Sequence, residues 1–246
     1  MPTLTILVTG GSSASGIAAA RALGAAGHRV FTVGSDEVRI KAAATQAGNG
    51  VTPLVCDLAS HDAVRDLADS LSGWGVASVD GVIHLVGGWR GAKGIEDQSD
   101  EDWDAMERGA ITTLRNVSRV FYSQLEASPH GRLAMISSTA ASSPTAAAAS
   151  YAAAKAAAEA WTLAVADGFR RDQAENRQDK GQQSEDLHSA AVIFVVKALV
   201  DSAMRTAHPE RRFPGYTDVE DLAAAVVGLF EEPAANLNGQ RILLAK

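Results

Sequence analysis

Cysteine is nearly absent from this chain, with Cys56 alone among 246 residues. A lone cysteine excludes an internal disulfide and is typical of a reducing compartment. Positive charge is also in short supply, because 22 Lys and Arg face 29 Asp and Glu and leave a net charge of −7. Nucleic acid partners prefer a basic face, so this balance argues against them.

Long hydrophobic runs are missing as well. No apolar stretch approaches the ~20 residues that a membrane-spanning helix needs. The opening residues, MPTLTILVTGG, carry no basic region and run straight into a strand-like segment. We therefore expect no signal peptide and no membrane partner, and we predict a cytoplasmic location. Pro-rich or Ser-rich linkers and internal repeats are lacking too, which favours a single domain over residues 1–246.

The chain does contain a regular alternation of strand-like and helix-like segments. Apolar, β-branched runs typical of buried parallel strands occur at 4–10, 28–34, 51–58, 79–88, 131–138, 189–199 and 239–245. Helical spacing occurs at 16–27, 37–48, 61–74, 100–125, 150–161 and 218–232. This alternation predicts an α/β fold, a Rossmann-type doubly wound parallel sheet of about seven strands with helices on both faces. The polar segment 170–188 predicts a mobile, solvated insertion, with a docking arm as the alternative.

A glycine-rich turn, TGGSSASGIA, lies between the first predicted strand and the first predicted helix. Gly10 allows a tight turn, and Gly16 allows the helix and strand to approach closely. The free amides at the start of the helix then face a pyrophosphate, helped by the helix dipole. Three serines add hydroxyl donors to phosphate: Ser12, Ser13 and Ser15. A small-residue turn without a ligand is the alternative.

Tyr151 and Lys155 lie four residues apart in the alanine-rich segment 150–161. Residues i and i+4 share a helix face, so the ammonium is predicted beside the phenol. A neighbouring cation stabilises phenolate and lowers the phenol pKa from its usual value of about 10. Ser138, at the end of a predicted strand, supplies a hydroxyl that can hold a substrate oxygen in place. A structural role on a packed helix face is the alternative for the pair.

Together these motifs resemble the short-chain dehydrogenase/reductase family over nearly the full length of the chain. Thr9, Gly10 and Gly16 match its Thr-Gly-x-x-x-Gly-x-Gly pattern, with Ala14 where the middle glycine belongs. An alanine there adds a methyl group close to the cofactor.

The resemblance also implies roles for residues elsewhere in the chain. In that family a Ser-Tyr-Lys set is catalytic, which implies this role for Ser138, Tyr151 and Lys155. Lys155 is further implied to bind the nicotinamide ribose, and Asp57 to bind the adenine. The implied cofactor-binding positions are Thr9, Gly10, Ser12, Ser13, Ser15, Gly16, Ile17, Ser35, Asp36, Asp57, Leu58, Val86, Gly87, Tyr151, Lys155 and Ser202. We predict no metal site.

Several positions depart from the family pattern. The stretch 84–87, HLVG, stands where the family has Asn-Asn-Ala-Gly, and Ala110 stands where it has a catalytic Asn. The missing Asn puts the family's proton relay through water in doubt. Lys197 replaces a proline and is either a solvated loop residue or an anion site. Ser202 replaces a threonine and can still donate to the cofactor.

The segment 79–91, VDGVIHLVGGWRG, is similar to dihydropteridine reductases, a branch of the family that also lacks the Asn and prefers NADH. Those enzymes usually lack the catalytic serine, which this chain has at Ser138. Trp89 is either a platform for a flat substrate ring or a loop aromatic that fills an apolar gap. The chain is therefore identified as a divergent family member with some dihydropteridine reductase-like features.

The residues after the second strand favour NAD over NADP. A carboxylate there accepts hydrogen bonds from the adenosine ribose and repels a 2′-phosphate. Asp36 follows Ser35, which occupies the family's usual Asp position. Ser13 stands where enzymes that use NADP often carry a basic residue. Asp36 as a solvated loop residue is the alternative, and the nearby Arg39 complicates the preference.

We therefore predict an NAD(P)-dependent oxidoreductase that moves hydride between nicotinamide and a carbonyl or alcohol substrate, with Tyr151 as acid and base. A dihydropteridine reductase-like enzyme and a catalytically impaired dinucleotide-binding regulator are the alternatives. The resemblance also implies a homodimer or homotetramer. The segment 199–216 is the expected substrate lid. Its Arg205, Arg211 and Arg212 either favour an anionic substrate or are solvated.

Overall fold

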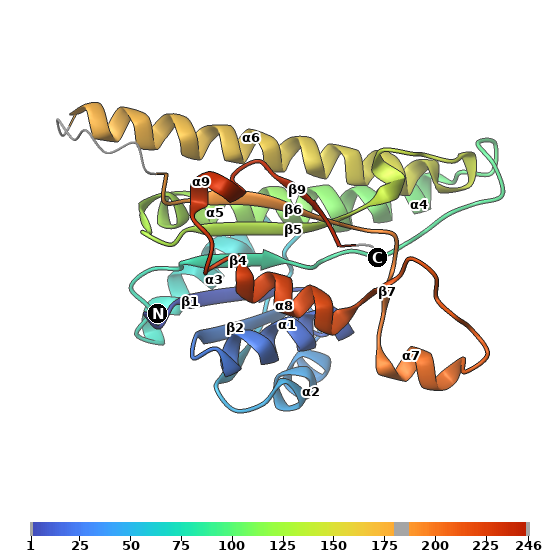
Figure 1. Cartoon of the computed structure of the whole chain (residues 1–246), viewed down its shortest axis with the longest axis horizontal. Helices are drawn as coiled ribbons and strands as arrows, with labels where there is room; N and C mark the ends of the chain where they lie inside the picture. Colours follow the sequence, from blue (N-terminus) through green and yellow to red (C-terminus); the bar gives the residue numbers. More distant parts are fainter. Residues whose placement is uncertain (1, 180–186, 245–246) are drawn as a thin grey trace.

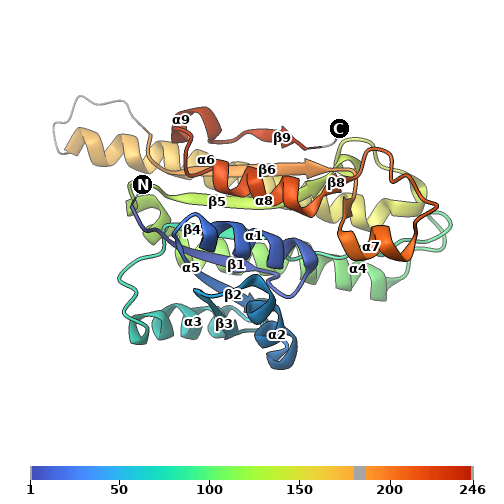
Figure 2. The same cartoon turned by 60° about the horizontal axis from the view of Figure 1, so that its bottom comes forward.

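Seven parallel strands form the main sheet of the computed structural model, which describes residues 2–179 and 187–244. Their order is β3-β2-β1-β4-β5-β6-β9, and each pairing is parallel (Figures 1 and 2). The strands are β1 (Thr5–Thr9), β2 (Arg29–Gly34), β3 (Val51–Val55), β4 (Gly81–His84), β5 (Arg132–Ser138), β6 (Ala190–Val196) and β9 (Arg241–Leu243). The predicted doubly wound parallel sheet is confirmed.

Helices cover both faces of this sheet, with α1 and α8 on one face and α3, α5 and α6 on the other (Figures 1 and 2). The longer helices are α1 (Ala14–Ala25), α2 (Glu37–Ala47), α3 (His61–Gly73), α5 (Thr113–Ala127), α6 (Ala149–Asp179) and α8 (Val219–Gly228). The shorter ones are α4 (Asp100–Met106), a π-helical turn η1 (Glu107–Thr112), two 3-10 turns η2 (Thr139–Ala141) and η3 (Ala146–Ala148), α7 (Ser202–Ala207) and α9 (Ala234–Leu237).

Strand β1 shows why the core has two halves. Ile6 and Val8 pack with Leu222 of α8, whereas Leu7 packs on the opposite face with Phe121 of α5. Successive side chains of a strand point to opposite faces, and both faces of this sheet are covered. This double burial explains the continuous apolar runs from which the strands were predicted.

The strand order reverses between β1 and β4, whose register pairs Thr9 with His84. In open parallel sheets such a reversal leaves a crevice beyond the carboxyl ends of the strands, where ligands bind. The glycine turn follows β1, and the segment 85–91 follows β4. Both therefore leave the sheet at this crevice.

A second, separate sheet consists of β7 (Leu199–Val200) and β8 (Thr217–Asp218), which pair in parallel. Helix α7 lies between them in sequence and projects to the side of the main sheet in Figure 1. Two-residue strands are too short to leave a periodicity in the sequence, so this pair was not predicted.

Helix α6 is longer than the sequence predicted. It runs for 31 residues, so residues 170–179 continue the helix, and the prediction of an unpacked insertion is wrong there. Gln173 explains the difference, because its buried amide donates to Ser189 Oγ at 2.7 Å and to the Glu126 carbonyl at 3.1 Å. Residues 180–186, also part of the predicted insertion, lie outside the described residues. Among the helices described, none is long and apolar enough to cross a membrane.

A buried arginine joins β5 to the end of α8. The Arg132 guanidinium, 4% exposed, donates to the carbonyls of Leu229, Gly131, His188 and Glu232 at 2.8–2.9 Å. Burial lowers the pKa of Arg132 to about 10, and the four carbonyls satisfy its donors.

We expect Arg132→Met to lower the free energy of unfolding by roughly 2–4 kcal/mol, because it leaves buried carbonyls without donors. Urea denaturation measures this change. The matched control is Arg170→Met, which removes an exposed ion pair with Asp167 and should change stability by less than about 1 kcal/mol. Equal effects of the two substitutions would contradict the structural role of Arg132.

Candidate active site

The glycine turn after β1 depends on two close backbone approaches. A Cβ atom at Gly10, whose φ is +72°, would lie 2.6 Å from the Leu85 carbonyl oxygen. A Cβ atom at Gly16 would lie 2.4 Å from the Gly10 carbonyl oxygen. Both positions therefore require glycine. Ala14, which replaces the family's middle glycine, is exposed, so its methyl group displaces no part of the turn.

Two of the three serines of this turn are bonded within it. Ser13 Oγ donates to the Gly10 carbonyl at 2.8 Å and accepts the Gly16 amide at 3.0 Å. Because its proton is committed, Ser13 accepts from Ser15 Oγ at 3.0 Å. These hydroxyls therefore hold the start of α1 in shape instead of presenting free donors. Ser12 is half-buried in the same turn.

A cavity of about 630 Å³ opens beyond the carboxyl ends of the central strands. Its lining comes from the glycine turn, the segment after β4, the end of β5, the start of α6 and the segment after β6. Six predicted site residues line it: Ser13, Ser15, Gly87, Ser138, Tyr151 and Lys155. The structure therefore brings the predicted catalytic set beside two serines of the glycine turn.

Ser138, Tyr151 and Lys155 are positioned by the contact of α6 with β5. Ser138 ends β5, and its hydroxyl is close enough to the Tyr151 phenol to influence the pKa of that group. Lys155 Nζ lies 6.0 Å from the centre of the Tyr151 ring and donates to the Ile136 carbonyl of β5 at 2.9 Å. The predicted i, i+4 arrangement on one helix face is present.

Burial governs the proton affinities of this pair. It raises the pKa of Tyr151, and the nearby Ser138 hydroxyl acts in the opposite direction. It lowers the pKa of Lys155 to about 8, while the nearby Glu159 carboxylate acts to raise it. The expectation of a lowered Tyr151 pKa is therefore wrong here, because loss of water around the phenol dominates. A phenol in this state keeps its proton at neutral pH and can act as an acid.

A model of the short chain dehydrogenase family matches residues 4–174. The chain belongs to the short-chain dehydrogenase family. This membership makes it an oxidoreductase of an NAD(P)-dependent family, as the sequence predicted.

Two relatives illustrate the likeness in sequence. A probable NADP-dependent dehydrogenase of Haemophilus influenzae is 29% identical over 147 residues, 59% of this chain. That match spans 58% of the Haemophilus protein. Nodulation protein G of Rhizobium meliloti is 26% identical over 96% of this chain and 93% of that protein.

Solved structures show the same fold at lower identity. An NAD+-bound xylitol dehydrogenase has a TM-score of 0.79 at 18% identity, covering 98% of this chain and 97% of that one. An oxidoreductase of the short chain dehydrogenase/reductase family from Burkholderia thailandensis has a TM-score of 0.81 at 18% identity. The match covers 99% of this chain and 92% of that one.

In this short-chain dehydrogenase, a buried histidine occupies one of the positions that depart from the family pattern. His84 lies between Thr9 Oγ1 at 2.8 Å and Thr113 Oγ1 at 3.2 Å. Thr113 gives its proton to the Gly109 carbonyl at 2.7 Å, so it accepts from His84 Nε2. His84 Nδ1 then accepts from Thr9, and burial, with the nearby Lys155 charge, lowers the His84 pKa to about 3. This chain of hydrogen bonds fixes a neutral imidazole between β1 and the start of α5.

Ala110, at the position of the family's catalytic Asn, belongs to an apolar cluster. It packs with Met106 and Ala154, and the Tyr151 ring lies against the same group. The π-helical turn η1 carries Ala110 at this point. The side chain at 110 therefore packs beside the tyrosine and has no polar atom for a proton relay.

Glu159 is a functional candidate that the sequence analysis missed. Ser137 Oγ donates to Glu159 Oε1 at 2.5 Å, and Arg241 Nε donates to its Oε2 at 2.8 Å. Glu159 lies one helical turn beyond Lys155, the same i, i+4 spacing that links Lys155 to Tyr151. Glu159 is the single acidic residue in SYAAAKAAAEAW. Its spacing from Lys155 could therefore have predicted a carboxylate near the lysine.

The remaining predicted cofactor residues lie outside the cavity lining. Asp36 caps α2, accepting the Arg39 amide at 2.8 Å, and its neighbour Ser35 is exposed. Asp57 forms an ion pair with Arg108 at 2.7 Å and is half-exposed. The other residues outside the lining are Thr9, Gly10, Ser12, Gly16, Ile17, Leu58, Val86 and Ser202.

Linkage predicts that Lys155 makes stability depend on pH. Its pKa in the folded protein, about 8, lies below its ordinary value of 10.5. The unfolded chain therefore binds more protons between these pH values, and the stability cost of burying Lys155 disappears as pH rises through them. Relative to Lys155→Met, we expect the native protein to gain roughly 2–3 kcal/mol over this range. Urea denaturation of both proteins at several pH values checks this, and a constant difference would contradict it.

Proposed function

We propose that this oxidoreductase interconverts a carbonyl and an alcohol, with Tyr151 as the acid and base. The observation that carries the proposal is that Ser138, Tyr151 and Lys155 line one cavity beside the glycine turn. In reduction, the Tyr151 phenol gives its proton to the carbonyl oxygen as that oxygen gains negative charge. The Ser138 hydroxyl holds the same oxygen.

The residues around the cavity fit a dinucleotide. Gly10 and Gly16 keep the turn free of side chains, and α1 begins there with its free amides. A nicotinamide cofactor bound at this turn supplies or accepts the hydride. Lys155 would hold the ribose near the tyrosine, and its ammonium keeps positive charge close to the phenol when the proton leaves.

A pteridine-type reductase is the second candidate, favoured by Trp89. Its side chain is 66% exposed and also lines the cavity, where a flat ring can stack on it. Assay with quinonoid dihydropterin and NADH separates this candidate from a general carbonyl reductase. No turnover above the uncatalysed rate removes it. The catalytic set inside one cavity supports an enzyme over a regulator that has lost catalysis.

The proposal extends to partners and location. A small-molecule carbonyl or alcohol is the substrate, with 199–216 as the lid, since Leu199 and Tyr216 line the cavity. A homodimer or homotetramer remains proposed, consistent with exposed Trp103 of α4 and Leu163 of α6. The buried thiol of Cys56 fits the proposed cytoplasmic location.

We expect Tyr151→Phe to lower kcat/KM for carbonyl reduction by about 10²–10⁴-fold while NADH still binds. The reason is that phenylalanine keeps the ring and removes the transferable proton. Tyr122→Phe is the matched control, because the Tyr122 hydroxyl donates to Asp172 outside the cavity lining. Full activity in Tyr151→Phe would discard the mechanism.

We further propose a preference for NAD, supported by Asp36, which caps α2 in the turn after β2. Asp36→Asn keeps an equally good cap for α2 and removes the negative charge. We expect the affinity for NADPH relative to NADH to rise about fivefold, as loss of one repulsion near the surface predicts. Fluorescence titration with both cofactors measures the ratio. Tighter binding of NADPH than NADH by the unaltered protein would overturn the preference.

A further inference from the structure

The cavity has a charge opposite to that of the chain. The protein carries a net charge of −7, yet two lysines line the cavity, Lys155 and Lys197. No Asp or Glu of the described residues contributes to the lining. Low-dielectric walls focus the field of uncompensated charge into a cleft, so this site attracts anions despite the acidic surface.

Lys197 is the cation available to a ligand. Lys155 donates to the Ile136 carbonyl and belongs to the catalytic set. Lys197 donates to the Pro214 carbonyl at 3.2 Å, and within the part of the chain that the structure describes it forms no ion pair. Its ammonium has three donors, so one contact leaves two free.

The turn at 213–216 holds the Lys197 side chain in place. A Cβ atom at Gly215 would lie 3.3 Å from Lys197 Cδ, so the lysine stem lies directly against this backbone. Phe213 anchors the turn, because it is 4% exposed and adopts a φ of +47°. A lysine held by such contacts loses less conformational freedom on binding an anion than a free one.

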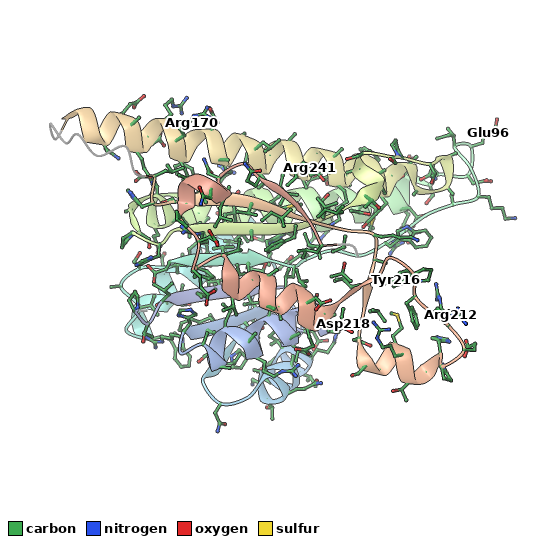
Figure 3. The ribbon with its side chains drawn as sticks, viewed as in Figure 1. Glu96, Arg170, Arg212, Tyr216, Asp218 and Arg241 are labelled. Carbon is green, nitrogen blue, oxygen red and sulfur yellow. The ribbon has the colours of Figure 1, made fainter. Side chains whose placement is uncertain are left out.

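A second cation, Arg211, contacts an aromatic side chain that lines the cavity. Arg211 donates to the Tyr216 hydroxyl at 3.0 Å, and its guanidinium lies 5.6 Å from the centre of that ring. Tyr216 lines the cavity, whereas Arg212 lies further out on the same loop (Figure 3). Arg205 differs, because Asp218 pairs with it at 3.3 Å.

We infer that the substrate is an anionic carbonyl compound whose acidic group, a carboxylate or its equivalent, is bound by Lys197 while its carbonyl faces Tyr151. This inference rests on the proposed carbonyl chemistry. Aromatic side chains at the same cavity, Trp89 and Tyr216, fit a substrate with an unsaturated ring between its two polar ends. In reduction the carbonyl carbon gains the hydride, the oxygen gains the Tyr151 proton, and NADH is oxidised.

The test compares two aldehydes, p-carboxybenzaldehyde and methyl p-formylbenzoate, in which a para carboxylate is replaced by its neutral methyl ester. The change in the ratio of their kcat/KM values between the unaltered protein and Lys197→Met isolates the contribution of Lys197 to binding the anion. In the unaltered protein we expect this ratio to favour the acid by about tenfold, and Lys197→Met should remove that preference through a higher KM for the acid. Lys93→Met is the matched control, because Lys93 is an exposed lysine of the neighbouring 88–99 loop outside the cavity lining.

Titration with NADH identifies the other possible role of Lys197. If Lys197→Met weakens NADH binding and lowers both kcat/KM values equally, the lysine serves the cofactor and the inference is overturned. A ratio of kcat/KM values for acid and ester near one in the unaltered protein also overturns the inference. Turnover of the ester in that case still supports the proposed carbonyl chemistry.

If neither aldehyde is reduced, quenching of bound NADH fluorescence by p-carboxybenzaldehyde decides the question. If Lys197→Met binds the acid more weakly than Lys93→Met does, the anion site is supported. In that case only the proposed carbonyl chemistry is contradicted. Absence of binding to the unaltered protein overturns the inference.

Discussion

The site depends on a lysine ammonium that is buried against the backbone of the central sheet. Lys155 donates to the Ile136 carbonyl of β5 at 2.9 Å, and this contact joins α6 to the sheet. Ala154 and Ala158, both buried, let the helix lie close enough for it. Tyr151, one turn earlier, is thereby brought against Ser138. The alanine-rich sequence is what permits a polar pair to sit at the edge of a packed core.

Three side chains near Ser138, Tyr151 and Lys155 contribute a hydrogen-bonded ring, apolar packing and a negative charge. Two of them, His84 and Ala110, differ from the family pattern. His84 links β1 to the start of α5 through two hydroxyls, directly after the π-helical turn that packs beside Tyr151. Ala110 extends the apolar packing beside the tyrosine. Glu159 adds a negative charge one turn beyond Lys155 and is held by Ser137 and Arg241. These three side chains surround the predicted catalytic set without displacing it.

Much of the fold could be predicted because its signals are local. Buried parallel strands leave continuous apolar runs, and a glycine turn between strand and helix marks the dinucleotide crevice. Contacts that join distant segments left no such signal: Arg241 and Glu159 are 82 residues apart, and Thr9 and His84 are 75 apart. The raised pKa of Tyr151 was missed for the same reason, since burial depends on how the elements pack. The helical end of α6 was missed because Gln173 finds its partners only in the folded chain.

The central claim is that this cavity transfers hydride to a carbonyl while Tyr151 supplies the proton. The most direct measurement is a single turnover with NADH deuterated at the transferred position and methyl p-formylbenzoate as acceptor, followed by mass spectrometry of the product. We predict one deuterium on the alcohol carbon of the product. If bound NADH is oxidised but the alcohol product carries no deuterium, hydride transfer from NADH to the carbonyl is contradicted.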